Sequence, residues 1–250
     1  MADGLAQLAG TAFFLGRINE DDETYTGYVV TAGHVIHGIR DRGVDEVLIR
    51  LNLLPGGSQW VRIDLASWYH HPDPAVDVAV FPSALPNHVD HLAYPLTAVG
   101  TEDVLRRQEI DVGSEVFVVG LFAHHFGLER NIPIVRMGNV AALREERVGT
   151  ALGPMDAYLI EARSIGGLSG SPVFARTPLV RVSVDGEIQF NRNPFGSYFL
   201  VGLIHGHFDA PVDAIDVGGR EGTSDHVNVG IAIVVPVEKI LETIAICPTS

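Results

Sequence analysis

The sequence has a single cysteine, a single lysine and no long hydrophobic segment. Because Cys247 has no second cysteine to pair with, no intrachain disulfide can form, and the chain is compatible with a reducing compartment. Its apolar runs have the length of strands and fall short of a membrane span. Residues 1–5 lack the basic and apolar stretches of a signal peptide. We therefore expect a cytoplasmic protein that does not bind membranes.

Positive charge is scarce as well. The chain has 17 Lys and Arg residues against 31 Asp and Glu residues, and a formal net charge of −14. Non-specific nucleic-acid binding depends on neutralising phosphates, so this balance argues against a nucleic-acid partner. There are 11 histidines, including the pair His205 and His207. No cysteine or glutamate cluster completes a metal-binding spacing around them, so we expect no metal site.

The residue pattern is mostly that of β-strands. Short runs of Val, Ile, Phe, Tyr and Leu alternate with clusters of Gly, Pro and Asp, which is typical of barrels or a sandwich. A length of 250 residues with 46% hydrophobic residues suits one large domain or two small packed barrels. The expected strands are 11–15, 27–31, 46–51, 77–81, 115–119, 158–162 and 199–204.

A hairpin and two helices stand out in this pattern. In the segment 181–190, Asp185 and Gly186 lie between two alternating runs, which predicts a hairpin with a tight two-residue turn. One short helix is expected over 32–37. A second should follow Pro236, where apolar residues recur at helical spacing. These residues are Val237, Ile240, Leu241 and Ile244.

The residue types needed for nucleophilic serine chemistry occur in the order His, Asp, Ser. His34 follows a strand-like segment, Asp77 opens the apolar run 77–81, and Ser169 lies in the Gly-rich segment 167–172. A serine hydroxyl needs an imidazole to take its proton and a buried carboxylate to hold that imidazole. A carboxylate at the start of an apolar strand needs a partner, which His34 would supply. We predict Ser169 as nucleophile, His34 as general base and Asp77 as the orienting carboxylate.

The competing interpretations have less support. Asp73 and His37 are the nearest alternatives, but Asp73 lies in a proline-flanked loop and His37 lacks the motif context. Each predicted residue also has a plain structural interpretation: a core histidine, a strand-edge aspartate or a loop without chemistry. An α/β-hydrolase elbow, G-x-S-x-G, is excluded because Ser171 occupies its final glycine position.

These segments resemble the trypsin/chymotrypsin-like serine proteases, in particular the disulfide-free bacterial branch of HtrA-type and glutamyl-endopeptidase-type enzymes. The resemblance rests on residues 25–34, 136–140, 167–172 and 230–236, and it extends from about residue 10 to about residue 240. His34 and Asp77 are 43 positions apart, and Asp77 and Ser169 are 92 apart. Chymotrypsin-type enzymes space the same three residues by about 45 and about 93 positions.

The resemblance implies an all-β fold of two six-stranded antiparallel β-barrels with a short C-terminal helix. Residues 1–105 would form the N-terminal barrel carrying His34 and Asp77. Residues 106–250 would form the C-terminal barrel carrying Ser169, together with the helix. The active site would lie in the cleft between the two.

The resemblance also assigns the backbone N–H groups of Gly167 and Ser169 to the oxyanion hole, and it implies no cofactor. Two departures from the family matter. Leu168 stands where zymogen-activated relatives carry an aspartate that pairs with a newly cut N-terminus. We therefore expect activity that does not depend on N-terminal trimming. The strand that often supplies a hydroxyl to the buried aspartate has no Ser or Thr at 201–205.

The resemblance places the substrate pocket at Arg163 and at His205, Gly206 and His207. An arginine fork can bind a carboxylate in bidentate geometry, and glutamyl endopeptidases carry a histidine on the same strand. We therefore expect cleavage after Glu or Asp. The alternative is that Arg163 points to solvent or pairs with an acid such as Glu161.

The sequence thus predicts a serine endopeptidase that cleaves protein or peptide substrates through an acyl-enzyme. A cytoplasmic protease must be restrained, so we expect a regulatory protein partner or a narrow substrate range. Two other interpretations stay open. One is a catalytically silent barrel that binds peptides or a partner protein, and the other is an esterase using the same triad.

Overall fold

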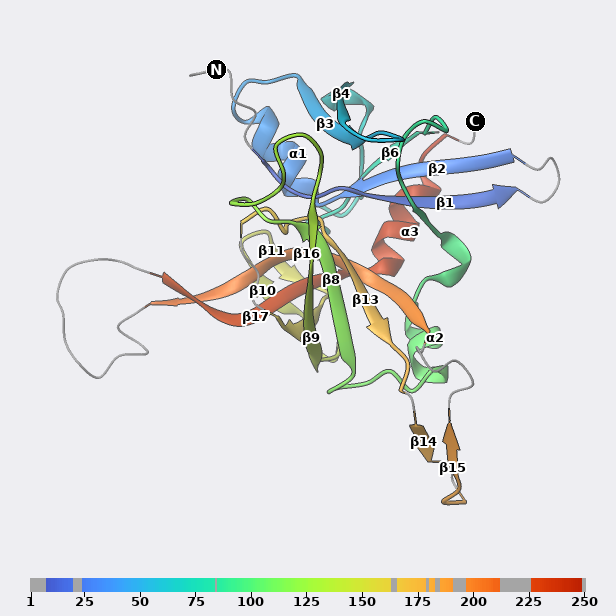
Figure 1. Cartoon of the computed structure of the whole chain (residues 1–250). Coiled ribbons are helices and arrows are strands. Elements are labelled where there is room, and N and C mark those ends of the chain that lie inside the picture. The colour runs from blue at the N-terminus through green and yellow to red at the C-terminus, as the bar shows by residue number, and fades with distance from the viewer. Residues whose placement is uncertain are drawn as a thin grey trace.

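The structure is a computed structural model in which residues 8–19, 24–83, 85–162, 166–178, 180–182, 185–190, 197–211 and 226–248 are described. Strands predominate in these residues and the helices are short (Figure 1). The predicted all-β class is confirmed. No helix in the described ranges combines the length and apolar character needed to cross a membrane.

The C-terminal half forms a closed barrel of six antiparallel strands, in the order β12-β17-β16-β13-β8-β9. The strands are β8 (Glu115–Leu121), β9 (Pro133–Ala142), β12 (Tyr158–Glu161), β13 (Pro172–Arg176), β16 (Tyr198–Pro211) and β17 (His226–Pro236). In β8 every second residue is buried, as expected where alternate side chains face a barrel interior. The barrel predicted for this half is confirmed.

The N-terminal half consists of a five-stranded sheet, in the order β5-β6-β2-β1-β7, and a separate hairpin of β3 and β4. These strands are β1 (Phe13–Asn19), β2 (Thr24–Thr31), β3 (Glu46–Asn52), β4 (Ser58–Asp64), β5 (Tyr69–His70), β6 (Ala79–Pro82) and β7 (Ala93–Pro95). β1 pairs with β7 in parallel and with β2 in antiparallel orientation. The hairpin packs its apolar residues, such as Ile63, against the sheet. This arrangement is compatible with the second predicted barrel, but pairing among the described strands does not close it.

Two small hairpins complete the strands: β10 (Val148–Thr150) with β11 (Gly153–Met155), and β14 (Val180–Val182) with β15 (Ile188–Phe190). The second is the hairpin predicted over 181–190. Val182 pairs with Ile188, and this register leaves an odd number of residues between them, so the predicted two-residue turn is wrong. This register centres the turn on Asp185. Gly186 has a positive φ, as expected for a glycine in a turn.

Three α-helices and two 3₁₀ turns occur in the part of the chain that the structure describes. They are α1 (Gly33–Arg40), α2 (Glu102–Arg107), α3 (Val237–Ala245), η1 (Leu65–Ser67) and η2 (Leu96–Ala98). α1 and α3 confirm the two predicted helices. α2 was not predicted; its acidic residues lie in the first turn and its arginines in the last, which suits the helix dipole. The predicted domain boundary at 105/106 falls inside this helix.

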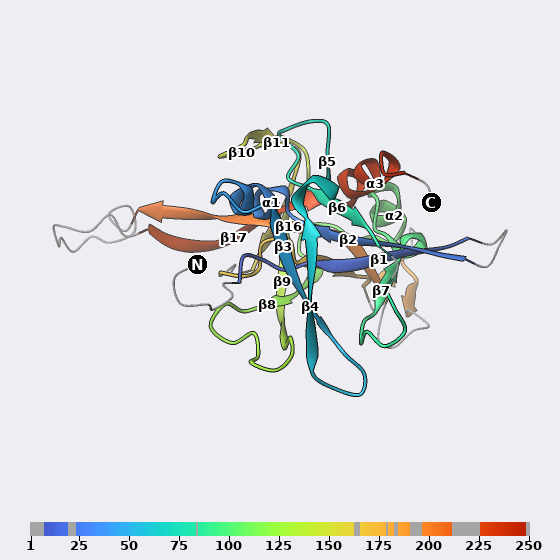
Figure 2. The same ribbon diagram turned by 90° about the horizontal axis from the view of Figure 1, so that it is seen from above.

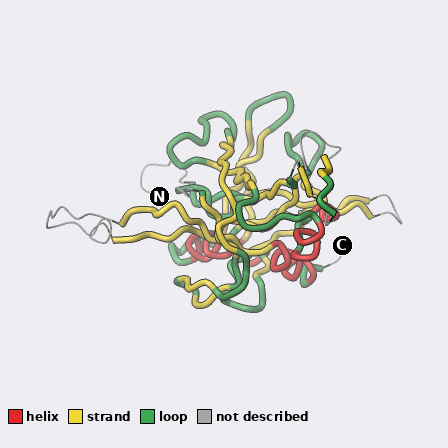
Figure 3. The backbone as a smooth tube through the Cα atoms, turned by 90° about the horizontal axis from the view of Figure 1, so that it is seen from below, coloured by secondary structure: helices red, strands yellow, loops and turns green. Residues whose placement is uncertain are grey.

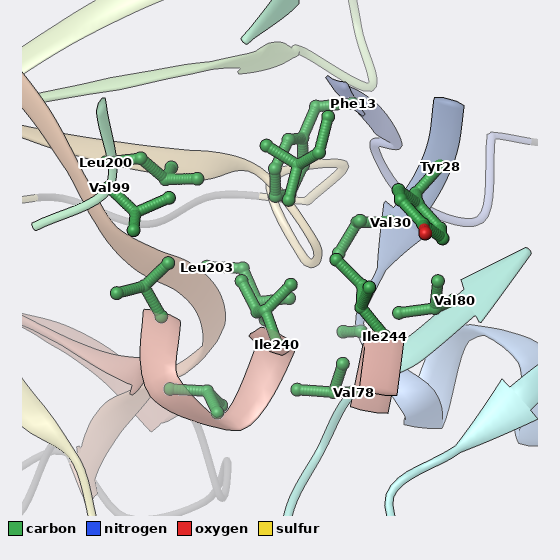
Figure 4. Packing of buried hydrophobic residues seen from close by; sticks show 14 of the residues in the cluster. Phe13, Tyr28, Val30, Val78, Val80, Val99, Leu200, Leu203, Ile240 and Ile244 are labelled. Carbon is green, nitrogen blue, oxygen red and sulfur yellow. The ribbon is translucent and has the colours of Figure 1, made fainter. Parts of the chain in front are cut away.

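The helix α3 covers a core to which both halves contribute. Its Ile240 and Ile244 pack with Val30 and Val80 of the N-terminal sheet and with Leu203 of β16 (Figure 4). All five side chains are buried. Burial of large aliphatic side chains of this kind stabilises by about 1.5–3 kcal/mol each. This shared core holds β2 and β16, the two strands that lead to the candidate site, against each other. Beyond the barrel, β16 and β17 extend together as a long pair (Figure 2 and Figure 3).

Candidate active site

His34 lies at the point where β2 gives way to α1. Its backbone N–H belongs to the first turn of the helix and has no intrahelical acceptor, so it is free to donate elsewhere. It donates to Asp77 Oδ1 at 2.6 Å, and the ring Nδ1 lies 2.7 Å from Asp77 Oδ2. The His34 side chain is 38% exposed. One edge of the ring is therefore held by Asp77, while the rest remains accessible.

Asp77 lies two residues before β6 and is buried, with 2% of its surface exposed. This confirms the predicted burial and the predicted contact with His34. A Cβ atom on Gly33 would lie 3.2 Å from Asp77 Oδ1, so the missing side chain at Gly33 permits the close approach. The alternative carboxylate, Asp73, is exposed and instead caps a turn by accepting a hydrogen bond from the Ala75 N–H.

The carboxylate of Asp77 is ionised. Burial alone would raise the pKa of Asp77, but hydrogen bonds from His205 and His34, and the charges on the two rings, outweigh this effect. Together they hold the pKa of Asp77 well below its ordinary value. The group is therefore an acceptor for both imidazole rings.

His205 is the third member of this cluster. Its Nδ1 lies 2.5 Å from Asp77 Oδ2, the same oxygen that contacts His34, and its side chain is 13% exposed. The rings of His34 and His205 meet edge to face, with centroids 5.5 Å apart. The sequence offered no Ser or Thr on this strand to hold Asp77, and the structure places His205 there.

The position of His205 follows from a β-bulge. Ile204 pairs with Val234, and Gly206 pairs with the next residue of β17, Ile233, so His205 is an extra residue in β16. Bulges interrupt the strict alternation of side chains and re-aim the inserted residue. Alternation along the strand alone could not have predicted where this side chain points.

Two of the other residues predicted to bind substrate, Gly206 and His207, lie in the described part of β16. His207 forms an ion pair with Asp209, at 3.1 Å, and Gly206 takes part in the pairing of β16 with β17. Arg163 lies outside the described residues. The assignment of these residues to a substrate pocket stays a prediction.

Ser169 lies in a tight turn held between the two halves of the chain. Gly167 and Gly170 on either side of it have positive φ values of 97° and 81°. Gly170 packs directly on β2 and the residue that follows it: a Cβ there would lie 2.4 Å from Thr31 Oγ1 and 2.9 Å from the Ala32 nitrogen. The Gly170 N–H also donates to the carbonyl of Ile204. These contacts hold the turn against the residues that precede His34 and His205 in the sequence.

Thr11 anchors this turn, and the sequence reasoning missed it. Its N–H donates to the Ser169 carbonyl at 2.9 Å, and its hydroxyl donates to the Gly167 carbonyl at 2.8 Å. The hydroxyl also accepts a hydrogen bond from the Leu121 N–H of β8. A single threonine before the first strand carries no motif, so nothing in the sequence alone marked it.

The two serines of the motif differ in accessibility. Ser171 is fully buried, and its hydroxyl faces Gly120 of β8 without a hydrogen-bond partner in the described ranges. Ser169 is partly exposed. Its hydroxyl makes no hydrogen bond to His34 as far as the described residues go. Catalytic hydrogen bonds are often long before substrate binds, so this leaves Ser169 a candidate.

The two N–H groups predicted for the oxyanion hole, those of Gly167 and Ser169, make no hydrogen bond to a described residue. The Gly166 carbonyl accepts a hydrogen bond from the Ala123 N–H. Because N–H and C=O point in opposite directions across a trans peptide, the Gly167 N–H points away from Ala123. Both groups predicted for the oxyanion hole are therefore available as donors.

Leu168 fills the space beneath the turn. It is 1% exposed and packs against β8 so closely that a Cβ on Gly120 would lie 2.8 Å from its Cδ2. An apolar side chain therefore stabilises the turn from below. No charged group at this position is available to pair with an N-terminal amine.

Comparison with known proteins places the chain in context. Residues 10–180 match the family described as the trypsin-like peptidase domain. The protease domain of MamO from Magnetospirillum magneticum is 14% identical, with a TM-score of 0.49, over 94% of this chain and 95% of that one. A glutamic acid specific serine protease, reported to use a histidine triad in substrate binding, is 16% identical, with a TM-score of 0.42, over 96% and 98%. A search of the curated proteins gives no match.

Proposed function

We propose that this chain, which belongs to the trypsin-like peptidase family, is a serine endopeptidase that uses Ser169, His34 and Asp77. One observation carries the proposal. The His34–Asp77 pair, joined at 2.7 Å, lies beside a glycine turn that leaves Ser169 partly exposed while burying Ser171. An accessible serine next to an imidazole that is held by a buried carboxylate is the arrangement that activates a hydroxyl.

Each group has a defined part in the proposed reaction. The Ser169 oxygen attacks the carbonyl carbon of the peptide bond, and His34 Nε2 takes the hydroxyl proton. Asp77 keeps the His34 Nδ1 protonated, so that Nε2 is the free base, and it stabilises the imidazolium that forms. The imidazolium then gives its proton to the leaving amine as the C–N bond breaks. Water, activated by the same imidazole, cleaves the acyl-enzyme and restores Ser169.

The developing negative charge on the substrate oxygen would be held by the N–H groups of Gly167 and Ser169. Both donors are free of described acceptors, and the positive φ of Gly167 is available to glycine without strain. Each such donor typically lowers the barrier by roughly 3 kcal/mol. Thr11 supports this arrangement because it binds the carbonyl groups of both residues.

The proposed preference for Glu or Asp before the cut depends on Arg163 and on the histidines of β16. Of these, His205 is engaged by Asp77, so His207 and Arg163 remain the candidates to receive a carboxylate. A peptide library read by mass spectrometry tests this preference. Cleavage concentrated after acidic residues supports it, while cleavage after apolar or basic residues rejects it.

Hydrolysis of the same library by three variants tests the proposed function. We expect cleavage by the wild type and by Ser171→Ala, and a loss of about 10⁴-fold or more in Ser169→Ala and His34→Ala. Far-ultraviolet circular dichroism establishes that each variant is folded. If the folded wild type cleaves neither peptides nor activated esters, the silent peptide-binding barrel becomes the better account.

A further inference from the structure

We propose that His205 is a positioning residue that holds Asp77, and through it His34, in the geometry needed for proton transfer. The inference rests on the proposed function and adds a fourth side chain to it. It also gives His205 a different role from the substrate contact that its position in the sequence suggests.

The buried carboxylate of Asp77 is held by several hydrogen bonds. Asp77 receives three donors: the backbone N–H of His34 at Oδ1, and the two Nδ1 atoms of His34 and His205 at Oδ2. The carboxylate is ionised and cannot donate, so each Nδ1 must carry a proton. His205 therefore presents its Nδ1–H to Asp77 and occupies the second lone pair of Oδ2.

Removing that donor changes the balance at Oδ2. A buried carboxylate oxygen without its hydrogen bond is costly in free energy. The carboxylate therefore rotates toward another donor. The nearest donor is the Nδ1–H of His34, which already serves Asp77. Any rotation of the carboxylate turns the His34 ring with it and shifts Nε2 away from Ser169. His205 prevents this rotation by binding the same carboxylate oxygen as His34, Asp77 Oδ2.

The bulge in β16 makes this contact possible and keeps it rigid. His205 is the inserted residue between two paired positions, and Ile204 immediately before it is held by hydrogen bonds to the two residues that follow Ser169. The Ile204 carbonyl accepts from Gly170, and its N–H donates to the carbonyl of Ser171. One backbone segment thus fixes the distance between the serine turn and the side chain that holds Asp77.

Several titratable side chains lie near His205 and can affect its charge. Asp77 and His34 face it directly, and His70 lies close enough to Asp77 to feel its charge. His37 stacks on His70, and His207 on the same strand pairs with Asp209. The exposed His88 offers a matched control, because replacing it removes an imidazole without touching Asp77 or the residues proposed to bind substrate.

Two amide variants separate positioning from a merely structural role. His205→Asn places an amide N–H near the position of Nδ1, whereas His205→Gln places it near Nε2. We expect His205→Asn to stay within about 10-fold of the wild-type kcat and His205→Gln to lose about 100-fold, with KM changed less than about 3-fold in both. The control His88→Gln, at an exposed histidine outside the proposed site, should keep the wild-type kcat.

Proton NMR gives a second measurement that does not need activity. The proton between His34 Nδ1 and Asp77 should give a low-field resonance that is present in the wild type and His205→Asn and is shifted or lost in His205→Gln. A variant in which KM rises while kcat and this resonance are unchanged would overturn the proposal in favour of a substrate contact. Equal kcat in the Asn and Gln variants would also overturn it. If the wild type is inactive, the proposed function fails and the resonance alone decides the role of His205.

Discussion

The hydroxyl of Thr11 donates a hydrogen bond to the carbonyl of Gly167 at 2.8 Å, across 156 positions of sequence. The same hydroxyl accepts from the Leu121 N–H, and the Thr11 N–H binds the Ser169 carbonyl. A residue just ahead of the first strand therefore fixes the turn that carries the proposed nucleophile. The N-terminal half contributes both His34 and the anchor of the serine turn.

Replacing Thr11 with valine tests this anchor. Thr11→Val keeps the shape of the side chain but leaves Gly167 O and Leu121 N without their partner. We expect a loss of about 1–3 kcal/mol in the free energy of unfolding and a fall in kcat of about 10-fold. Urea unfolding and steady-state kinetics measure the two effects. Thr11→Ser should restore both, and a valine variant with wild-type kcat would show that the anchor does not serve catalysis.

Activity should not require a cut N-terminus. Leu168 is buried and carries no charge with which a new terminal amine could pair. A protein that begins at Leu8 should therefore keep kcat/KM within about 2-fold of the full chain. The comparison is a rate measurement on two preparations whose termini are verified by intact mass. A strict requirement for trimming would contradict the role assigned to Leu168.

The stability of the fold should fall between pH 7 and pH 5 because of His70. Neither ring nitrogen of His70 finds a partner in the described ranges, and the ring stacks on His37 at 4.4 Å. Burial, followed by the charges of His37 and Arg40, lowers the pKa of His70 from 6.5 to about 4. The stability that the fold has while His70 is neutral is therefore fully present above pH 6.5 and is lost as the pH falls toward 4.

The shift corresponds to at most about 3 kcal/mol, which solvent screening of the partly exposed ring reduces to about 1–2 kcal/mol. His70→Phe should lose that much less stability than the wild type between pH 7 and pH 5, as measured by urea unfolding at each pH. His125→Phe, at an exposed histidine, serves as a control and should lose as much stability as the wild type between pH 7 and pH 5. A wild-type pH dependence in His70→Phe would refute the assignment.

Arg144 should matter for stability far more than a surface arginine. Its side chain is 12% exposed and pairs with Glu102 of α2, Glu238 of α3 and Asp156, and it lies over the ring of Tyr158. Arg144→Met leaves these acids without their cation, and we expect it to cost about 2–4 kcal/mol in thermal or urea unfolding. Arg106→Met removes an exposed pair and should cost less than about 1 kcal/mol. Equal effects would contradict the account of this cluster.

The sequence predicted the strands and the contact between Asp77 and His34 because their signals are local. The run that begins at Asp77 is apolar, which predicts a buried strand with a carboxylate in need of a partner. The glycines at 167 and 170 indicate a tight turn, because such a turn needs residues with positive φ and glycine adopts these without strain. The terminal helix follows from apolar residues at helical spacing after Pro236.

The remaining features depend on contacts that no local pattern encodes. The direction of the His205 side chain is set by a bulge in β16. That bulge exists only in the pairing of β16 with β17, a separate strand later in the chain. Thr11 acquires its role only when β8 and the serine turn are brought to it. The two-residue turn at Asp185 failed for a related reason, because the pairing of Val182 with Ile188 determines the length of the connection.

The reactivity of Ser169 tests the central claim most directly. We would treat the wild type, Ser169→Ala, Ser171→Ala and His34→Ala with a fluorophosphonate and measure the intact mass of each folded protein. We expect one adduct on the wild type and on Ser171→Ala, mapped to Ser169, and none on Ser169→Ala or His34→Ala. An unlabelled wild type, or an adduct that persists in Ser169→Ala, would contradict that claim.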